Sequence, residues 1–227
     1  HRVVAFIAVH SVVADAAADY RVALARSRDL PLFGSTPEAV IAMGEAGLAP
    51  AGTLEDLLGR ADIIVDATPK HVGAANKARY DAHGLRSVFQ GGEPHELTGL
   101  SFVAQANYAA AHDARAARVV SCNTTGLVRV LGGLHDHGLL ESARAVLLRR
   151  GTDPWESHRG GMINTVLPEA KVPSHQGPDA RTVLPDLNLV TVAAAGPFNL
   201  AHVHFAFITA PRPRASMPPS AARWCSP

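Results

Sequence analysis

One stretch, residues 118–134, constrains the fold more than any other part of this chain. It opens with a short β-branched run that is typical of the end of a buried strand. Apolar residues then recur at helical spacing from Leu127 onward, which predicts a helix beginning near Thr124. Cys122 is therefore expected at a strand-to-helix turn, where unpaired helix N–H groups and the helix dipole favour an anion such as a thiolate. A lone cysteine is more often a small buried residue, so on local pattern both interpretations stay open.

The first half of the chain alternates strand and helix patterns. Strands are predicted at 3–9, 63–65, 87–89 and 118–120. One helix is predicted to begin at 36–37, a second to begin at 53–54, and a third to span 72–83. The continuous apolar run at 63–65 is typical of a strand covered on both faces. This rhythm predicts an α/β fold with a doubly wound, mostly parallel sheet.

The rhythm changes in the second half, for which we predict an α+β domain with an antiparallel sheet. Strands are expected at 143–148, 187–192 and 199–208, and the proline-rich stretch 168–185 is expected to form loops. The tail beginning at Ala210 has the composition of turns and disorder. The predicted domains are therefore residues 1–120, residues 121–209 and an unrelated or disordered tail, 210–227.

The composition is that of an ordinary soluble globular protein. The 227 residues are 47% hydrophobic and 18% charged, with a net charge of +1, so neither nucleic acid nor an anionic membrane is expected as a partner. No apolar run is long enough to span a bilayer, and no signal peptide is evident. The two cysteines, Cys122 and Cys225, suggest no disulfide framework. A cytoplasmic location is the natural expectation.

Two further patterns contain chemically capable residues. His202 and His204 alternate on a predicted strand and so share one face, although such a pair is more often structural. A metal site is a third possibility, but no carboxylate or cysteine stands nearby in sequence to complete it. Arg149 and Arg150 close a strand and point to opposite faces, so at most one is expected to reach a site, and solvated charge is an equal alternative.

Several motifs together resemble archaeal-type (type II) phosphorylating glyceraldehyde-3-phosphate dehydrogenase. They occur in the order of that family and cover roughly residues 15–208. The motifs are Ser121-Cys122-Asn123-Thr124-Thr125-Gly126-Leu127, Asp62-Ile63-Ile64-Val65-Asp66-Ala67-Thr68-Pro69, Phe89-Gln90-Gly91-Gly92-Glu93, Arg149-Arg150-Gly151-Thr152-Asp153-Pro154 and Pro173-Ser174-His175-Gln176-Gly177-Pro178-Asp179. A semialdehyde dehydrogenase using the same thioester chemistry is disfavoured, because the last of these motifs resembles a specific phosphate loop.

The resemblance implies a partial Rossmann-like NAD(P)-binding domain followed by a partial catalytic domain. It also implies oxidation of D-glyceraldehyde 3-phosphate, with inorganic phosphate and NAD or NADP, to 1,3-bisphosphoglycerate in glycolysis or gluconeogenesis, in a homotetramer. The roles carried over are Cys122 as nucleophile, His202 as general base, Ser121, Asn123, Thr124, His175, Gln176 and Gly177 as substrate-binding residues, and Gly92 and Arg150 as cofactor-binding residues. No metal site is implied.

The chain also departs from the family pattern. It contains no Gly-x-Gly-x-x-Gly turn, the motif that seats a dinucleotide pyrophosphate on a helix N-terminus. Residues 1–9 correspond to the second strand of the family, and its C-terminal strands and returning helix have no counterpart. We therefore expect the isolated chain to bind dinucleotide weakly. The alternative to a dehydrogenase is a truncated, non-catalytic remnant that keeps the fold.

Overall fold

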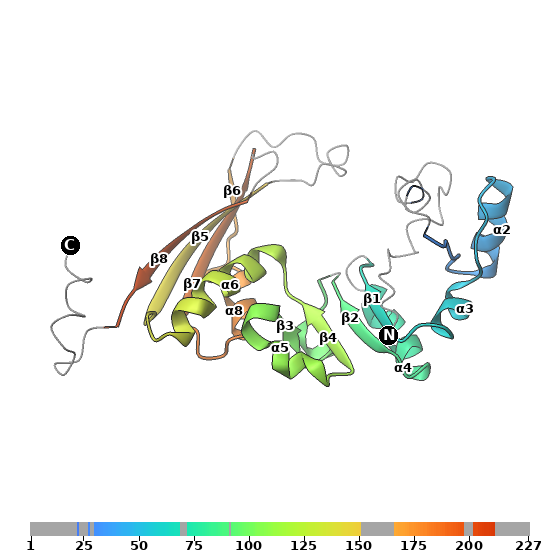
Figure 1. Ribbon diagram of the computed structural model, residues 1–227. Coiled ribbons are helices and arrows are strands. Elements are labelled where there is room, and N and C mark those ends of the chain that lie inside the picture. The colour runs from blue at the N-terminus through green and yellow to red at the C-terminus, as the bar shows by residue number, and fades with distance from the viewer. Residues whose placement is uncertain are drawn as a thin grey trace. The chain divides into compact units, whose positions relative to one another are not determined.

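The computed structural model describes residues 22, 27, 30–68, 72–90, 92–150, 166–197 and 202–211. The chain divides into two compact units between Ser121 and Cys122 (Figure 1), and each unit is described by itself. The predicted strand at 3–9, the tail from residue 212 and Cys225 lie outside the described residues. No described helix is both long and apolar enough to cross a membrane.

The first unit is built on a parallel sheet. Its described elements are α2 (Pro37–Glu45), α3 (Leu54–Leu58), β1 (Ile63–Asp66), α4 (Val72–Ala82), β2 (Arg86–Phe89), the 3₁₀ turn η2 (His95–Leu97), β3 (Ser101–Phe102), α5 (Ala104–His112) and β4 (Ala116–Val119). The strand order is β1-β2-β4-β3, and all three pairings are parallel. The α/β architecture predicted for this half is confirmed for the described strands.

Local sequence signals set the helix boundaries of this unit. Thr36 caps α2, since its Oγ1 accepts a hydrogen bond from the Ala39 N–H at 3.2 Å, and proline occupies the first helical position. Thr53 and Asp56 form a reciprocal capping box at the start of α3. Gly84 follows α4 with φ of +68°, a left-handed conformation that glycine adopts without strain. These helix starts and the stop at Gly84 were predicted correctly.

The core of the first unit surrounds a buried carboxylate. Leu58, Ile64, Tyr80, Leu85 and Phe89 form one buried cluster. At the end of β1, Asp66 accepts hydrogen bonds from the Thr68 N–H and hydroxyl, from Asn76 Nδ2 and from the Tyr80 hydroxyl. Burial, together with the hydrogen bond to Asp66, raises the pKa of Tyr80 far above its ordinary value. Asp66 therefore orders the turn that follows β1.

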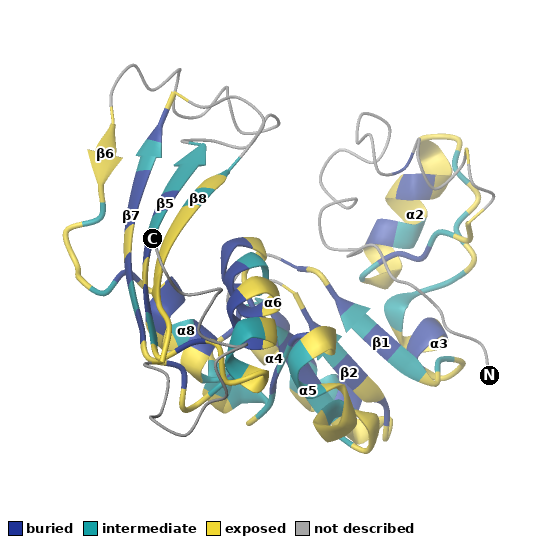
Figure 2. Cartoon of the chain, turned by 60° about the vertical axis from the view of Figure 1, so that its left-hand side comes forward, coloured by how far each residue is buried: buried dark blue, intermediate teal, exposed yellow. Residues whose placement is uncertain are grey.

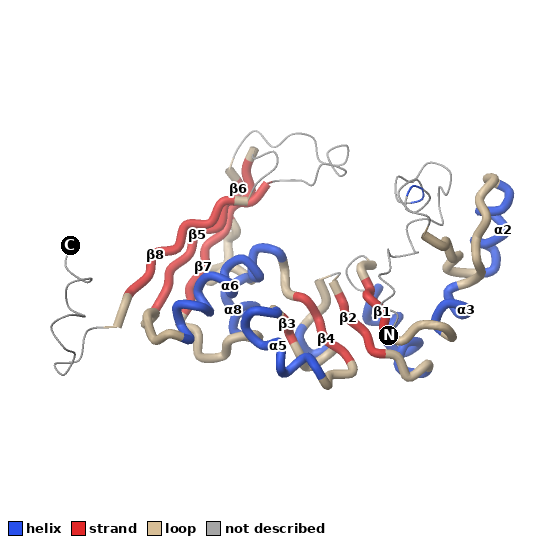
Figure 3. The backbone as a smooth tube through the Cα atoms, in the orientation of Figure 1, coloured by secondary structure: helices blue, strands red, loops and turns tan. Residues whose placement is uncertain are grey.

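The second unit packs two helices on one face of a mixed sheet (Figure 3). Its described elements are α6 (Cys122–Asp136), β5 (Ser142–Arg150), β6 (Leu167–Pro168), α8 (Gln176–Arg181), β7 (Leu189–Gly196) and β8 (Val203–Thr209). The strand order is β6-β7-β5-β8. The outer pairings, β6–β7 and β5–β8, are antiparallel as predicted, whereas the central pair β5–β7 is parallel.

Two predictions for this unit were wrong in detail, and they have one cause. The stretch 168–185 is not all loop, because it contains α8. The connection from β5 to β7 thereby includes a helix, and a crossover of this kind joins parallel strands. An antiparallel central pair, which a short hairpin would give, is thus excluded by the length and content of the connection.

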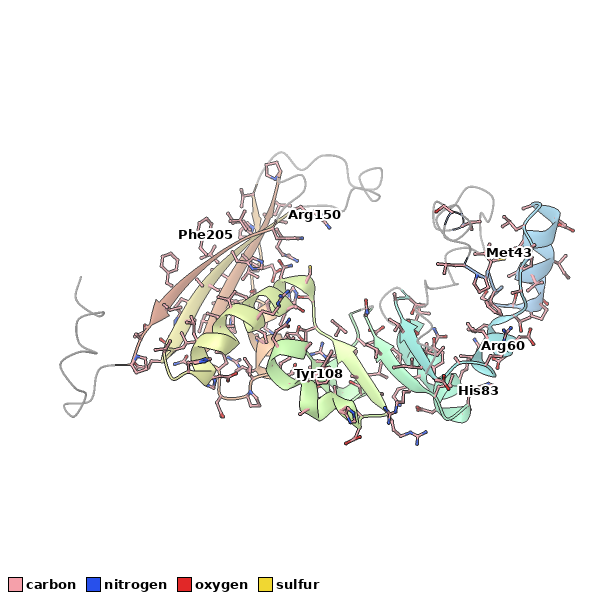
Figure 4. The ribbon with its side chains drawn as sticks, in the orientation of Figure 1. Met43, Arg60, His83, Tyr108, Arg150 and Phe205 are labelled. Atoms are coloured by element: carbon pink, nitrogen blue, oxygen red, sulfur yellow. The ribbon has the colours of Figure 1, made fainter. Side chains whose placement is uncertain are left out.

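The strand β8 lies at one edge of the second sheet and is largely exposed, with His204 its one half-buried residue (Figure 2). Phe205 and Phe207 are 51% and 66% exposed, while His204, the residue before Phe205, contacts helix α6. Because side chains alternate along a strand, the two phenylalanines point away from α6, as Figure 4 shows for Phe205. His204 therefore lies on the helix-covered face of this sheet, and the two phenylalanines lie on the opposite face.

Candidate active site

The candidate nucleophile is the first residue of helix α6. The helix begins at Cys122, two residues earlier than predicted, so Cys122 lies in the first helical turn rather than ahead of it. Cys122 is exposed, and its thiol is free. The next two residues turn inward, since Asn123 is 6% exposed and Thr124 is fully buried. Asn123 thus connects an accessible thiol with the interior of the unit.

A hydrogen bond ties this helical turn to the edge strand. His204 Nε2 lies 2.8 Å from Asn123 Oδ1, although the two residues are 81 positions apart in sequence. The imidazole also packs on the next turn of α6, because a Cβ placed on Gly126 would lie 3.5 Å from His204 Cε1. Desolvation by burial, with a smaller contribution from the charge of His202, lowers the pKa of His204 below its ordinary value. His204 is consequently a neutral ring near neutral pH.

The candidate base His202 stands immediately before β8. His202 is half-buried, and its charge contributes to lowering the pKa of His204, two residues later. His202 and Cys122 therefore belong to the two segments that the Asn123–His204 hydrogen bond joins. The assignment of His202 as the base stays a prediction.

The predicted phosphate loop is partly buried and strongly cross-linked. The Thr191 hydroxyl, in β7, donates to the Ser174 carbonyl oxygen at 3.0 Å and accepts from the Gly177 N–H at 3.0 Å and the Ser174 hydroxyl at 2.8 Å. The Ser174 hydroxyl also lies 2.7 Å from Gln176 Oε1. A Cβ on Gly177 would lie 2.9 Å from Thr191 Oγ1, so glycine permits this close approach. Gln176 and Gly177 are buried, whereas the His175 side chain is 57% exposed.

A carboxylate links this loop to strand β5. Glu169 accepts a hydrogen bond from Arg149 Nη2 at 2.6 Å, and its second oxygen lies 3.5 Å from His175 Nδ1. The interaction places Arg149 beside the exposed histidine of the loop. Arg150 is the last residue of β5 (Figure 4), and its cofactor role stays a prediction.

In the first unit, Gly92 is exposed at the carboxyl edge of the parallel sheet. Its φ is +90°, and among the described residues no atom beyond its chain neighbours lies within 4 Å of a Cβ placed there, so a flat ring has room to approach the backbone. The buried Arg118 supports the following residue, donating from Nη1 to the Glu93 carbonyl oxygen at 3.1 Å and from Nε to the Ser101 hydroxyl at 2.8 Å. This clamp fixes the turn that carries Gly92.

The structure thus groups only some of the predicted residues. Cys122, Asn123 and Thr124 share the first turn of α6, Asn123 bonds to the strand after His202, and His175, Gln176 and Gly177 share one helix start. Ser121 and Gly92 belong to the first unit. Within the described residues, no group of three His, Cys, Asp or Glu side chains is arranged to hold a metal ion. Sequence reasoning missed the contributions of Glu169, Thr191 and Arg118, and for the last of these the signal was a charged residue inside a predicted buried strand.

Comparison with known proteins shows what the chain is similar to. No protein-family model matches the chain. A glyceraldehyde-3-phosphate dehydrogenase of Thermococcus kodakarensis is 46% identical over 195 residues, which are 86% of this chain and 57% of that protein. Those of Pyrobaculum neutrophilum and Halobacterium salinarum are 45% and 42% identical over 84% and 88% of this chain. These three relatives are all glyceraldehyde-3-phosphate dehydrogenases.

The resemblance predicted from the motifs is confirmed by these matches. The chain nevertheless spans only 56–60% of the length of the three glyceraldehyde-3-phosphate dehydrogenases. Among solved structures, aspartate semialdehyde dehydrogenase II of Vibrio cholerae, complexed with ASA, matches with a TM-score of 0.52 and 10% identity, covering 70% of this chain and 55% of that one. This likeness concerns the fold alone, and it agrees with the predicted α/β class.

Proposed function

We propose that this chain carries the thiol site of a phosphorylating glyceraldehyde-3-phosphate dehydrogenase. The substrates are D-glyceraldehyde 3-phosphate and inorganic phosphate, and the product is 1,3-bisphosphoglycerate. Cys122 is the nucleophile and His202 the general base. Ser121, Asn123 and Thr124 hold the aldehyde end of the substrate.

The observation that carries this proposal is the 2.8 Å hydrogen bond between His204 and Asn123. It joins the residue after the candidate nucleophile to the strand preceded by the candidate base. An activated nucleophile requires a base within reach, and a separation of about 80 residues in sequence is bridged only by the fold. The exposure of Cys122 adds access for a substrate.

The chemistry follows from the roles of these residues. The Cys122 thiolate attacks the aldehyde carbon, a C–S bond forms, and the carbonyl oxygen takes a proton to give a hemithioacetal. His202 accepts that hydroxyl proton while a hydride leaves the carbon, so a thioester on Cys122 remains. Inorganic phosphate then attacks the thioester, the C–S bond breaks, and the acyl phosphate departs with the thiolate restored.

Phosphate recognition falls to the cluster at the start of α8. His175 is exposed, and Glu169 holds it beside Arg149. The Arg149 guanidinium and the exposed His175 ring both offer N–H groups, and such donors suit a phosphate group. Glu169 lies against both Arg149 and His175, so its role is to orient these two side chains rather than to contact the phosphate.

The first unit fits the ring end of a nicotinamide dinucleotide. Open space in front of Gly92 and the clamp of Arg118 on Glu93 present a fixed, uncovered backbone at the edge where such folds bind ligands. A bound nicotinamide supplies the acceptor for the hydride. Arg150 is proposed to contact its phosphate, and either NAD or NADP is compatible with the chain. We further propose a homotetramer located in the cytoplasm.

Protection of the thiol by substrate tests the proposal directly. The purified chain is alkylated with iodoacetamide, and modification of Cys122 and Cys225 is followed separately by mass spectrometry. D-Glyceraldehyde 3-phosphate is expected to slow the alkylation of Cys122 but not that of Cys225. Glyceraldehyde, which lacks the phosphate, is expected to protect Cys122 less. In His175→Ala, this difference in protection between the two aldehydes is expected to be smaller. Equal alkylation of both cysteines with and without substrate overturns the proposal and leaves a non-catalytic remnant. The variant Cys122→Ser controls for the assignment of the modified peptide.

A further inference from the structure

We propose that His204 is a positioning residue that fixes the side-chain amide of Asn123, so that its NH₂ group, not its carbonyl oxygen, is presented beside Cys122. The inference deepens the proposed function, since it rests on Cys122 being the nucleophile. It assigns a specific task to the second histidine of the pair, which the motif alone leaves as a neighbour of the base.

The geometry restricts the amide to one orientation at a time. A carboxamide has an acceptor end and a donor end on opposite sides, so whichever end meets His204 determines which end points elsewhere. Asn123 is 6% exposed and its Oδ1 lies 2.8 Å from His204 Nε2. In the part of the chain that the structure describes, this is the hydrogen bond that His204 forms. Turning the amide over would therefore require the imidazole to change from donor to acceptor.

The surroundings of the ring indicate which nitrogen carries the proton. His204 Nδ1 lies toward Gly126, at 3.6 Å from a Cβ placed there, and a glycine offers no side-chain acceptor. The chargeable groups on the neighbouring elements are His202 on the same segment, Arg144, Arg149 and Arg150 on β5, and Cys122, Arg129, His135 and Asp136 on α6. Burial and the charge of His202 lower the pKa of His204, so the ring is neutral and holds one proton. With that proton on Nε2, Asn123 Oδ1 accepts.

The consequence is a pair of N–H donors directed away from β8. Donors fixed before the reaction stabilise oxygen atoms that gain negative charge, as the aldehyde oxygen does when the thiolate attacks. A neutral His204 supplies this order without placing a positive charge next to His202. If His204 were in the other tautomer, the Asn123 amide would turn over, and its carbonyl oxygen would repel the developing charge.

Nitrogen NMR of the wild-type chain tests the orientation without requiring any turnover. The ¹⁵N shifts of His204 are expected to show the Nε2–H tautomer at neutral pH, and the Asn123 side-chain amide is expected to shift when His204 is replaced. A dominant Nδ1–H tautomer, or an Asn123 amide that ignores the replacement, overturns the proposal. If wild-type Cys122 gains no protection from substrate, the proposed function fails, but the NMR result still decides this inference.

Matched variants then test the consequence for the substrate. In His204→Leu, about tenfold more D-glyceraldehyde 3-phosphate is expected to be needed for the same protection of Cys122, the effect of one lost hydrogen bond. His204→Gln keeps an N–H donor and is expected to recover most of that loss. Phe207→Leu, on the opposite face of β8, is the control and is expected to match the wild type. Unchanged protection in His204→Leu, or no recovery in a folded His204→Gln, contradicts the proposal.

Discussion

Replacing Thr191 by valine tests how the predicted phosphate loop is held to the sheet. Thr191 is fully buried in β7, and its hydroxyl makes three hydrogen bonds to Ser174 and Gly177 at 2.8–3.0 Å. Valine has the same shape but lacks the hydroxyl, so the change removes these bonds without creating a cavity. Both loop residues keep one other partner, because the Gly177 N–H also lies 3.1 Å from the Ser174 carbonyl oxygen.

The magnitude follows from these bonds. Three hydrogen bonds at about 0.5–1.5 kcal/mol each amount to about 1.5–4 kcal/mol. The added methyl group returns about 0.8 kcal/mol through burial. The expected loss in the free energy of unfolding for Thr191→Val is therefore about 2 kcal/mol. Thr191→Ser keeps the hydroxyl and loses only a buried methyl group, so its expected loss is about 1 kcal/mol.

Urea unfolding of the two variants decides between hydrogen bonding and packing. The comparison requires equal m-values, which show that both variants expose the same surface on unfolding. Thr191→Val is expected to unfold at the lower urea concentration. In this variant, substrate is also expected to protect Cys122 less against alkylation. If Thr191→Ser is the less stable of the two, packing of the methyl group holds the loop and the hydrogen-bond argument is refuted.

Three further predictions concern stability and are checked by the same unfolding measurement. Gly133→Ala is expected to stabilise α6 by about 0.5–1 kcal/mol, because the site is exposed and open. The neighbouring Gly132→Ala is expected to stabilise less or to destabilise, since its Cβ would lie 3.1 Å from Leu184. Equal gains in stability for the two variants would contradict this. Asp66→Asn is expected to cost about 3 kcal/mol, because an amide cannot accept from all four donors, and a neutral effect would show that these bonds contribute little. Because folding lowers the pKa of His204, the unfolded chain binds more protons, so stability is expected to fall as pH drops through about 6.5; His204→Gln is expected to reduce this dependence, and an unchanged pH profile would contradict it.

The parts of the fold that sequence predicted are those set by near neighbours. The caps at Thr36 and Thr53 act within three residues, and the glycine after α4 acts at its own position. Helix α8 escaped prediction because it is only six residues long and is tied to β7 by Thr191, 14 residues beyond Gly177. Short helices have little stability of their own and depend on tertiary contacts that a local pattern does not contain.

The candidate site shows the same division. The motif pointed to the candidate nucleophile segment and the histidine pair, but not to the hydrogen bond between Asn123 and His204, which spans 81 positions. The effect of Glu169 on Arg149 and His175 also depends on distant strands meeting in one sheet. Residue types near a reactive group can thus be predicted from a motif, whereas their orientation depends on long-range packing.

The two units divide the proposed chemistry, and this makes its halves separately measurable. The thiol, the Asn123–His204 pair and the loop held by Thr191 all lie in the second unit, whereas Gly92 and its Arg118 clamp lie in the first. Substrate protection of Cys122 therefore reports on contacts made by the second unit and by Ser121, the residue that adjoins it. Replacing Arg118 releases the backbone of Glu93 and is expected to alter dinucleotide binding with little effect on the intrinsic reactivity of the thiol. A change of both measurements by the same factor would show instead that the two halves act as one site.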